Sequence, residues 1–314
     1  MNESKYTHTS VLLNECVDAL QVRDHLTYID CTAGSGSHSF QIAKRMGANS
    51  RLICIDRDAA AIAAAGQRLF AFGQQVRMIR ANFSELENIL QQEHVDNLGG
   101  VLLDLGCSSH QFDTPDRGFS YNHDARLDMR MDTDQTLDAY LVVNTYPEAV
   151  LKKIIYEYGE ERFAPQIAAL IVKTRANAPI TTTKELSELI KQAIPAAARA
   201  DGPHPAKRTF QAIRIEVNGE LDAIAPALQT AVRHLVPGGR VAVISFHSLE
   251  DRIVKETFAE LAQGCTCPKD FPVCICGRQP LIRPVSRKPI LPSAEELSKN
   301  PRARSAKLRV VEKR

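Results

Sequence analysis

The chain has no long hydrophobic run, and no apolar stretch in its 314 residues approaches the roughly 20 needed to cross a bilayer. Its opening residues, Met-Asn-Glu-Ser-Lys-Tyr-Thr-His, have no apolar core, which excludes a secretory signal peptide. Internal repeats and low-complexity stretches are also absent. With 44% hydrophobic and 24% charged residues, the composition predicts a globular, cytoplasmic protein with no membrane partner.

The clearest local pattern is a glycine turn after a short apolar strand. Residues 28–39 read Tyr-Ile-Asp-Cys-Thr-Ala-Gly-Ser-Gly-Ser-His-Ser, and a second apolar strand ends twenty residues after Gly36, at Asp56. In an α/β sheet this spacing places a nucleoside over the turn, with Asp56 accepting hydrogen bonds from ribose hydroxyls. The dinucleotide fingerprint needs a third glycine where this chain has Ser39, preceded by His38. The pattern therefore favours a cofactor without a pyrophosphate, of which S-adenosylmethionine is the common one.

The order of hydrophobic patterns predicts an α/β fold. Four apolar segments are predicted to be strands, at residues 28–31, 51–55, 76–79 and 100–105. Helical patterns alternate with them, which is typical of a parallel, right-handed βαβ sheet. From Phe112 to about Lys207 the pattern is mostly helical, and a buried strand returns within residues 235–248. We therefore expect a Rossmann-like sheet interrupted by an inserted helical domain.

Ligands of open α/β sheets bind at the carboxyl ends of the strands, so the residues there are the candidates. They are Gly34, Gly36, Ser37 and His38 at the first turn, Asp56 after the second strand, Phe83 after the third, Asp104, Ser108, Ser109 and Gln111 after the fourth, and Phe246 and His247 after the last. Each also has an ordinary structural explanation: Phe83 as a core residue, Ser108 as a helix cap and His247 as a surface histidine. Their shared location favours a ligand site.

The net charge of +2 conceals an asymmetry. Residues 278–314 hold 11 Lys/Arg and 3 Asp/Glu, and residues 139–214 hold 11 and 7. Basic segments suit RNA, because neutralised phosphates release counterions, although a solvated terminal extension is the alternative for the tail. The candidate RNA-binding side chains are Lys152, Lys153, Lys173, Arg175, Lys207, Arg208 and Arg214 in the insert, and Arg302, Arg304 and Lys307 in the tail.

Four of the eight cysteines are crowded into one short segment, as Cys265-Thr-Cys267 and Cys274-Ile-Cys276. Without a secretory signal, two close pairs indicate a metal before disulfides, and four thiolates would suit tetrahedral zinc. However, Cys-x-Cys is tighter than the usual Cys-x₂-Cys, and Pro268 and Pro272 stiffen the intervening loop. An unmetallated thiol loop is therefore the favoured interpretation, and structural zinc stays open.

Long, unusual motifs extend over nearly the whole chain. Besides the glycine turn, they are His8-Thr-Ser-Val-Leu-Leu13, Leu103-Asp-Leu-Gly-Cys-Ser-Ser-His-Gln111, Arg117-Gly-Phe-Ser120, Leu127-Asp-Met-Arg-Met-Asp132, Tyr158-Gly-Glu-Glu-Arg-Phe163, His204-Pro-Ala-Lys-Arg-Thr-Phe-Gln-Ala-Ile-Arg214, Ile244-Ser-Phe-His-Ser-Leu-Glu-Asp-Arg252 and Asn300-Pro-Arg-Ala-Arg-Ser305. With these motifs the chain resembles the bacterial RsmH (MraW) methyltransferase family. The resemblance implies an S-adenosylmethionine-dependent enzyme that methylates N4 of cytosine 1402 in 16S rRNA, within the small ribosomal subunit. A homodimer is left open.

The resemblance also implies site residues and domains. The family's cofactor contacts fall on Gly36, Ser37, His38, Asp56, Phe83, Asp104 and Gln111. A class I methyltransferase core would comprise residues 1–111 and 209–314, with an inserted RNA-binding domain at 112–208. Two features depart from the family pattern: Ser37 stands where a second consecutive glycine is common, and the cysteine loop occurs only in some members.

The residue that handles the target amine is not evident from the motifs. The usual Asp/Asn-Pro-Pro-aromatic signature of amino methylation is replaced by Asp104-Leu-Gly-Cys107, so the candidates at the base are Ser109, Phe246 and His247. Cytosine C5 methylation is disfavoured, because it needs a cysteine nucleophile on the next strand, which reads Ser245-Phe-His-Ser248. A non-catalytic RNA-binding assembly factor is the alternative from a different class, and it would not bind S-adenosylmethionine.

Overall fold

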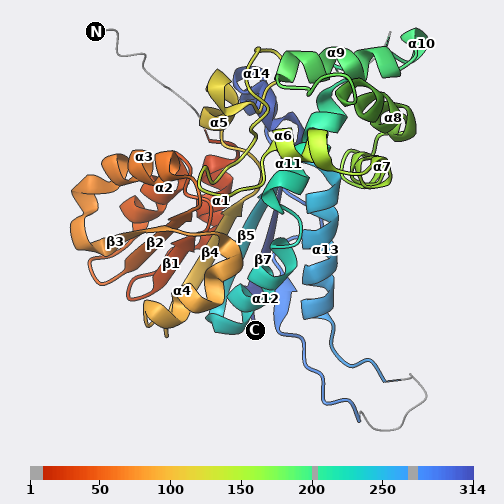
Figure 1. Ribbon diagram of the computed structural model, residues 1–314. Helices are drawn as coiled ribbons and strands as arrows, with labels where there is room; N and C mark the ends of the chain where they lie inside the picture. Colours follow the sequence, from red (N-terminus) through yellow and green to blue (C-terminus); the bar gives the residue numbers. More distant parts are fainter. Residues whose placement is uncertain (1–9, 200–203, 268–274) are drawn as a thin grey trace. The chain divides into compact units, whose positions relative to one another are not determined.

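The computed structural model describes residues 10–199, 204–267 and 275–314 (Figure 1). The chain divides into two compact units, the first comprising Met1–Gly106 with Leu221–Arg314 and the second Cys107–Glu220. Helix α11 (Lys207–Asn218) belongs to the second unit, because Phe210 and Ile213 pack into the core of that unit. The divisions therefore fall after residues 106 and 220, whereas the sequence predicts them after residues 111 and 208.

A seven-stranded sheet forms the centre of the first unit (Figure 1). Its strands are β1 (Thr27–Asp30), β2 (Arg51–Asp56), β3 (Val76–Arg80), β4 (Leu98–Asp104), β5 (Leu235–Ser245), β6 (Ile282–Pro284) and β7 (Lys307–Lys313). In the order β3-β2-β1-β4-β5-β7-β6, the first five strands run parallel, and β7 and β6 complete the sheet with antiparallel pairings. The predicted α/β fold class is thus confirmed. The direction of strand succession reverses between β1 and β4, which marks the place where such sheets bind ligands.

Helices cover both faces of this sheet. Helices α1 (Leu13–Leu20), α2 (Ser37–Arg45) and α3 (Ala59–Leu69) pack on one face, and α4 (Leu86–Gln92), α12 (Ile224–His234) and α13 (Ser248–Ala262) on the other. Neighbouring strand residues enter opposite cores, as Leu52 and Cys54 pack with the first set of helices and Ile53 with the second. Because β1, β2 and β4 are buried on both faces, they read in the sequence as mainly apolar runs, whereas β3 at the edge of the sheet has no buried residue.

The basic C-terminal segment, residues 278–314, contributes two strands, β6 and β7, to the sheet, so it is not a solvated extension. After α14 (Ala294–Lys299) and η4 (Pro301–Ser305), strand β7 pairs with β5 along six residues. In β7, Lys307 Nζ lies 2.9 Å from Oδ2 of Asp251 on α13, and Arg309 Nε lies 2.6 Å from its Oδ1. Arg240 Nη2 of β5 lies 2.8 Å from Oε2 of Glu312. Part of the positive charge of this segment therefore serves to hold the sheet and α13 together.

The second unit is helical, as the pattern after Phe112 predicts. Its elements are α5 (Ser109–Asp113), η3 (Pro115–Arg117), α6 (Ala139–Thr145), α7 (Glu148–Glu157), α8 (Ala164–Arg175), α9 (Thr183–Ala193), α10 (Ala196–Arg199) and α11. Leu151 of α7, Ile167 of α8 and Ile213 of α11 share one apolar core. In the part of the chain that the structure describes, no helix has the length and apolar character to span a membrane.

Candidate cofactor site

Three carboxylates end three neighbouring strands at the carboxyl edge of the sheet. Asp30 is the last residue of β1, Asp56 of β2 and Asp104 of β4. Strand β1 pairs with both β2 and β4, so the three acidic residues belong to adjacent strands around the reversal of strand order. This edge is the expected ligand position in such sheets, and it unites two of the predicted residues, Asp56 and Asp104, with one that the sequence did not single out.

The glycine turn connects β1 to α2 and requires both of its glycines. Gly34 and Gly36 have φ angles of 52° and 77°, which non-glycine residues rarely adopt. A Cβ atom on Gly36 would lie 3.0 Å from Cα of Ala65, so the turn also lets α2 approach α3 closely. The Gly34 amide donates to Oδ2 of Asp56 at 2.9 Å, and the Asp58 amide donates to Oδ1 at 2.9 Å. The Asp56 carboxylate is thereby fixed in place, with one lone pair of each oxygen still available for a ribose hydroxyl.

The first turn of α2 carries buried polar side chains that pack toward the strand ends. Ser39, fully buried, donates to Oδ2 of Asp30 at 2.5 Å and accepts from the Cys54 thiol at 3.3 Å. Ser37 Oγ accepts a hydrogen bond from Arg68 of α3. The serine at position 39, where a dinucleotide-binding turn has its third glycine, is thus explained by its hydrogen bond to the carboxylate of β1.

His38 is buried beside Asp104, with Nδ1 3.6 Å from Oδ2 of the carboxylate. Burial lowers the pKa of His38 from 6.5 to about 4, so the imidazole is neutral at physiological pH. Its Nε2 is buried and has no hydrogen-bond partner among the described residues. The predicted contact of His38 with a cofactor therefore involves an uncharged ring.

Asp104 and Asp30 form an acidic pair that burial makes unfavourable. Burial, with the nearby charges of Asp30 and Glu250, raises the pKa of Asp104 well above its usual value. Burial also raises the pKa of Asp30 from 3.8 to about 6, although hydrogen bonds from Ser39 and Thr32 oppose the shift. Oδ1 of Asp104 is buried and has no hydrogen-bond partner among the described residues. Such a site favours a cationic ligand, because a positive charge stabilises the ionised carboxylates.

Phe83 and Gln111 lie in different units. Phe83 begins η2 (Phe83–Glu85) after β3, where its half-buried ring packs against the core of the sheet. Gln111 is buried in the second unit and closes a capping box with Ser108, whose amide donates to Oε1 of Gln111 at 3.0 Å. The structure thus gives Ser108 its helix-capping role and gives the Gln111 side chain a first partner within its own helix.

The turn after β5 holds two of the three candidates for work on the base. A carboxylate oxygen of buried Glu250 accepts from the amides of Phe246 at 2.7 Å and His247 at 3.2 Å. The Phe246 ring lies against the turn after β4, since a Cβ on Gly106 would be 3.6 Å from its Cδ2. The third candidate, Ser109, begins α5, and its side chain is outside the described part of the chain.

His247 is the N-cap of α13 and is engaged by the first turn of that helix. Its Nδ1 accepts from the Glu250 amide at 3.5 Å. Its Nε2 lies 3.1 Å from Oε1 of Glu250, although the two atoms are not aligned as a hydrogen bond. A capping role for His247 is therefore evident in the structure, whereas a role as a base is still a hypothesis.

Some of the predicted RNA-binding cations have clear structural partners, and others are exposed, among them Arg208, which also donates to the Glu160 carbonyl at 3.2 Å. Arg214 makes two hydrogen bonds of 2.8 Å to the Glu220 carboxylate, and Arg175 donates to the carbonyls of Val143 and Tyr146. With Lys307, which pairs with Asp251 of α13, these side chains have structural partners. Those that are exposed are Lys152, Lys153, Lys173, Lys207 and Arg208 in the second unit, and Arg302 and Arg304 in η4.

The sequence did not single out four residues whose hydrogen bonds position the site. Asp30, Thr32 and Ser39 lie within the quoted glycine-turn motif, and Glu250 within the motif after β5. Thr32 Oγ1 accepts from the Asp104 amide at 2.6 Å, so the turn after β1 also fixes the end of β4. The available signal was a carboxylate ending an apolar strand, which is costly to bury without a partner.

The chemistry of these residues fits S-adenosylmethionine. Asp56 offers free carboxylate lone pairs to ribose hydroxyls, and the glycine turn allows the backbone to approach the ligand closely. Asp104, whose Oδ1 has no hydrogen-bond partner among the described residues, and Asp30 suit a cofactor whose sulfonium and amine are positive, because that positive charge would stabilise their ionised forms. The residues that would hold the cofactor are thus Gly34, Gly36, Asp56 and Asp104, with Phe83 beside the adjacent strand end.

Comparisons with known proteins identify relatives along the whole chain. The sequence model of the MraW methylase family matches residues 5–314. A protein named ribosomal RNA small subunit methyltransferase H from Symbiobacterium thermophilum is 54% identical over 308 residues, which cover 98% of this chain and 97% of that one. A protein of the same name from Brevibacillus brevis is 51% identical over 313 residues, 100% of each chain. Among solved structures, a putative rRNA-methylase from Clostridium thermocellum gives a TM-score of 0.46 at 13% identity, over 98% of this chain and 100% of that chain.

Proposed function

We propose that this chain, which belongs to the MraW methylase family, methylates ribosomal RNA of the small subunit in the cytoplasm. The sequence motifs predict both the family and its cofactor, S-adenosylmethionine, and the family match confirms both. The target that we propose is the N4 amine of cytosine 1402 in 16S rRNA, within the small subunit. The observation that carries the proposal is the set of carboxylates at the reversal of strand order, in a chain 54% identical to a small-subunit rRNA methyltransferase.

The cofactor, when bound, would supply a sulfonium methyl group, whose carbon forms a bond to the amine nitrogen as the neutral thioether leaves. The chain positions the donor: Asp56 would bind the ribose, and Asp104 would face the positive charge of the donor. Alignment of donor and acceptor can contribute on the order of 7–11 kcal/mol to lowering the barrier. The rigid hydrogen bonds around Asp56 and the amide-to-hydroxyl bond between Asp104 and Thr32 supply that preorganisation.

At the target base, Phe246 is the side chain that we assign to stacking on the cytosine. Its backbone is held by Glu250 and its half-buried ring packs against Gly106, two residues after Asp104. Aromatic stacking is the usual way to hold a nucleobase that has been unstacked from RNA. The amine must also lose a proton, and Ser109 and His247 are the candidates for accepting it.

The test is methyl transfer by the purified full-length protein to small ribosomal subunits and to free 16S rRNA. Nuclease digestion and mass spectrometry distinguish N4-methylcytidine from 5-methylcytidine and locate the methyl group. We expect N4-methylcytidine at position 1402, with subunits as the better substrate. Product at carbon 5 would contradict the proposed target, and RNA binding without S-adenosylmethionine binding would favour an assembly factor.

The carboxylate role is tested by a matched pair of variants. Asp56→Asn should raise KM for S-adenosylmethionine, because an amide presents a donor where the ribose hydroxyls need an acceptor. Asp58→Asn is the control, since Asp58 instead caps α3 by accepting from the Ala60 amide at 3.0 Å. Equal effects of the two substitutions on KM would contradict the assignment of Asp56.

A further inference from the structure

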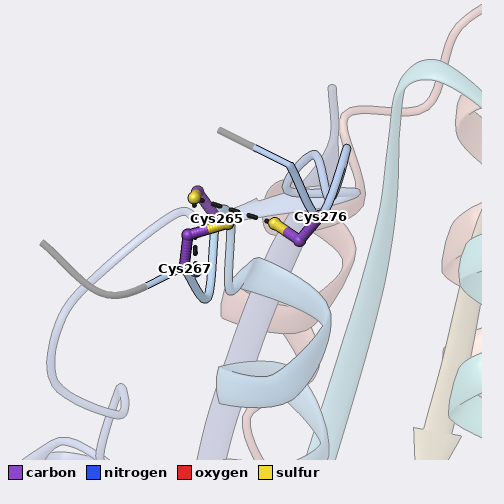
Figure 2. A group of neighbouring side chains, drawn as sticks. All are labelled: Cys265, Cys267 and Cys276. Atoms are coloured by element: carbon purple, nitrogen blue, oxygen red, sulfur yellow. Dashed lines mark hydrogen bonds between the residues drawn. The ribbon is translucent and has the colours of Figure 1, made fainter. Parts of the chain in front are cut away.

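Three cysteine thiols gather in the loop between α13 and β6, a part of the first unit that the proposed function does not use. Cys265 and Cys267 lie on the limb that leaves α13, and Cys276 lies on the limb that returns to β6 (Figure 2). All three Sγ atoms lie within 4.8 Å of one another, and Cys265 and Cys276 are separated by 3.7 Å. Cys274, the remaining cysteine of the sequence motif, lies outside the described residues.

Hydrophobic packing does not bring these thiols together. None of the described residues 264–267 and 275–281 is buried, and the Ile275 side chain is 75% exposed. Two hydrogen bonds close the base of the loop instead: the Leu281 amide donates to the Leu261 carbonyl at 3.0 Å, and the Arg278 guanidinium donates to the Glu260 carbonyl at 3.0 Å. The limbs are thus aligned at their base, while the thiols meet beyond it on exposed chain.

Each of the three sulfurs accepts a backbone hydrogen bond. The Cys267 amide donates to Cys265 Sγ at 3.4 Å, the Ile275 amide to Cys267 Sγ at 3.4 Å, and the Thr266 amide to Cys276 Sγ at 3.5 Å. A neutral thiol is a weak acceptor, whereas a thiolate is charged and binds N–H groups more strongly. Amide donors directed at every sulfur are therefore the surroundings expected for metal-bound thiolates, whose outer partners orient them.

The separation of the Cys265 and Cys276 sulfurs suits a tetrahedral metal rather than a disulfide between them. A disulfide requires about 2.05 Å between sulfurs, far less than the 3.7 Å between Cys265 and Cys276. Zinc–thiolate bonds of about 2.3 Å at tetrahedral angles place sulfurs about 3.8 Å apart. The sulfurs of Cys265 and Cys267 both lie within 4.8 Å of the Cys276 sulfur. The Cys-x-Cys spacing therefore does not prevent both thiols from approaching the cysteine of the opposite limb.

We propose that Cys265, Cys267 and Cys276 bind a Zn²⁺ ion that fastens the two limbs of this loop. Thiolates are soft ligands that select zinc over the oxygen-preferring Mg²⁺ and Ca²⁺, and Zn²⁺ needs no redox chemistry to stay bound. The three thiolates provide three positions of a tetrahedral site. Because the ion joins Cys276 to the two cysteines that follow α13, its role is to order an exposed loop that has no apolar core.

The test is the zinc content of the full-length protein after exposure to Zn²⁺ and removal of unbound metal. We expect about one zinc per chain in the unaltered protein. Cys265→Ser and Cys276→Ser should each lower it at least tenfold. Thr266→Ala is the matched control, because it changes the same exposed loop without removing a thiol, and it should keep the metal. A metal-free unaltered protein, or cysteine variants that keep their zinc, would overturn the proposal.

A second measurement uses the unaltered protein and so does not depend on whether a variant folds. Titration of the unaltered protein with Co²⁺ should produce thiolate-to-cobalt charge-transfer absorption that Zn²⁺ abolishes. A chelator should make the loop between α13 and β6 more susceptible to protease, and added Zn²⁺ should restore its resistance. If cobalt gives no thiolate absorption, or if the thiols are found paired as a disulfide in the purified protein, the zinc site is refuted.

Discussion

Asp30 provides a quantitative test of how the strand-end carboxylates are held. Its folded-state pKa of about 6 lies above the ordinary 3.8, because burial outweighs the hydrogen bonds from Ser39 and Thr32. The folded chain therefore binds this proton more tightly than the unfolded chain does. Stability is lost as pH rises from about 4 to about 6, and a difference of about 2 units corresponds to about 3 kcal/mol.

The substitution Asp30→Asn removes this titration while it keeps an oxygen for the Thr32 amide, which donates to Asp30 at 3.1 Å. The free energy of unfolding of the variant, relative to the unaltered protein, should therefore rise by about 3 kcal/mol between pH 4 and pH 7. Urea unfolding at several pH values measures this difference. Asp96→Asn, the same change at an exposed position, is the control.

The same reasoning predicts the pH dependence of cofactor binding. S-adenosylmethionine is positive, so it should bind more weakly as pH falls through about 6, where Asp30 becomes protonated. This dependence should be flatter in Asp30→Asn. If the unaltered protein and the two variants show parallel stability curves between pH 4 and pH 7, Asp30 has no raised pKa and the reasoning is refuted.

Three further substitutions test separate parts of the account. Gly36→Ala should lower the free energy of unfolding by about 1–2 kcal/mol and weaken cofactor binding, because φ is 77° and Ala65 leaves no room for a Cβ atom. An unchanged melting temperature and an unchanged cofactor affinity would contradict this prediction. Arg214→Met should destabilise the protein by about 3 kcal/mol, because it leaves the buried Glu220 carboxylate unpaired, and urea unfolding measures this loss. A loss of RNA affinity without a loss of stability would instead indicate that Arg214 acts at the surface. Lys207→Glu, at an exposed position, should weaken RNA binding without changing cofactor affinity. The slope of log affinity against log salt concentration should become smaller by about one, which filter binding at several salt concentrations measures.

Most of the parallel part of the fold was predictable because β1, β2 and β4 are buried on both faces. The segments predicted at residues 28–31 and 51–55 appear as β1 and β2 with boundaries shifted by at most one residue. Strand β7 was not predicted, since Lys307 and Arg309 alternate with its apolar residues and resemble a solvated basic tail. Only the position of Asp251 on α13, which depends on tertiary structure, shows why those cations are there.

The sequence predicted which residues form the candidate site, but not the burial, pairing or protonation of their side chains. The spacing between the glycine turn and Asp56 indicated the two partners that the structure joins through the Gly34 amide. The neutral state of His38 and the raised pKa of Asp104 depend on burial that a linear sequence does not encode. The paired state of Arg214 has the same origin, because Glu220 lies two residues beyond the end of α11 and outside any charge pattern of the helix.

Mass spectrometry of 16S rRNA from a strain that lacks the gene for this chain tests the proposed methylation of N4 of cytosine 1402. We expect the N4-methyl group at position 1402 to be absent in that strain. A copy of the unaltered gene should restore the methyl group, and an Asp104→Ala copy should not. Intact N4 methylation in the deletion strain would refute the proposed target.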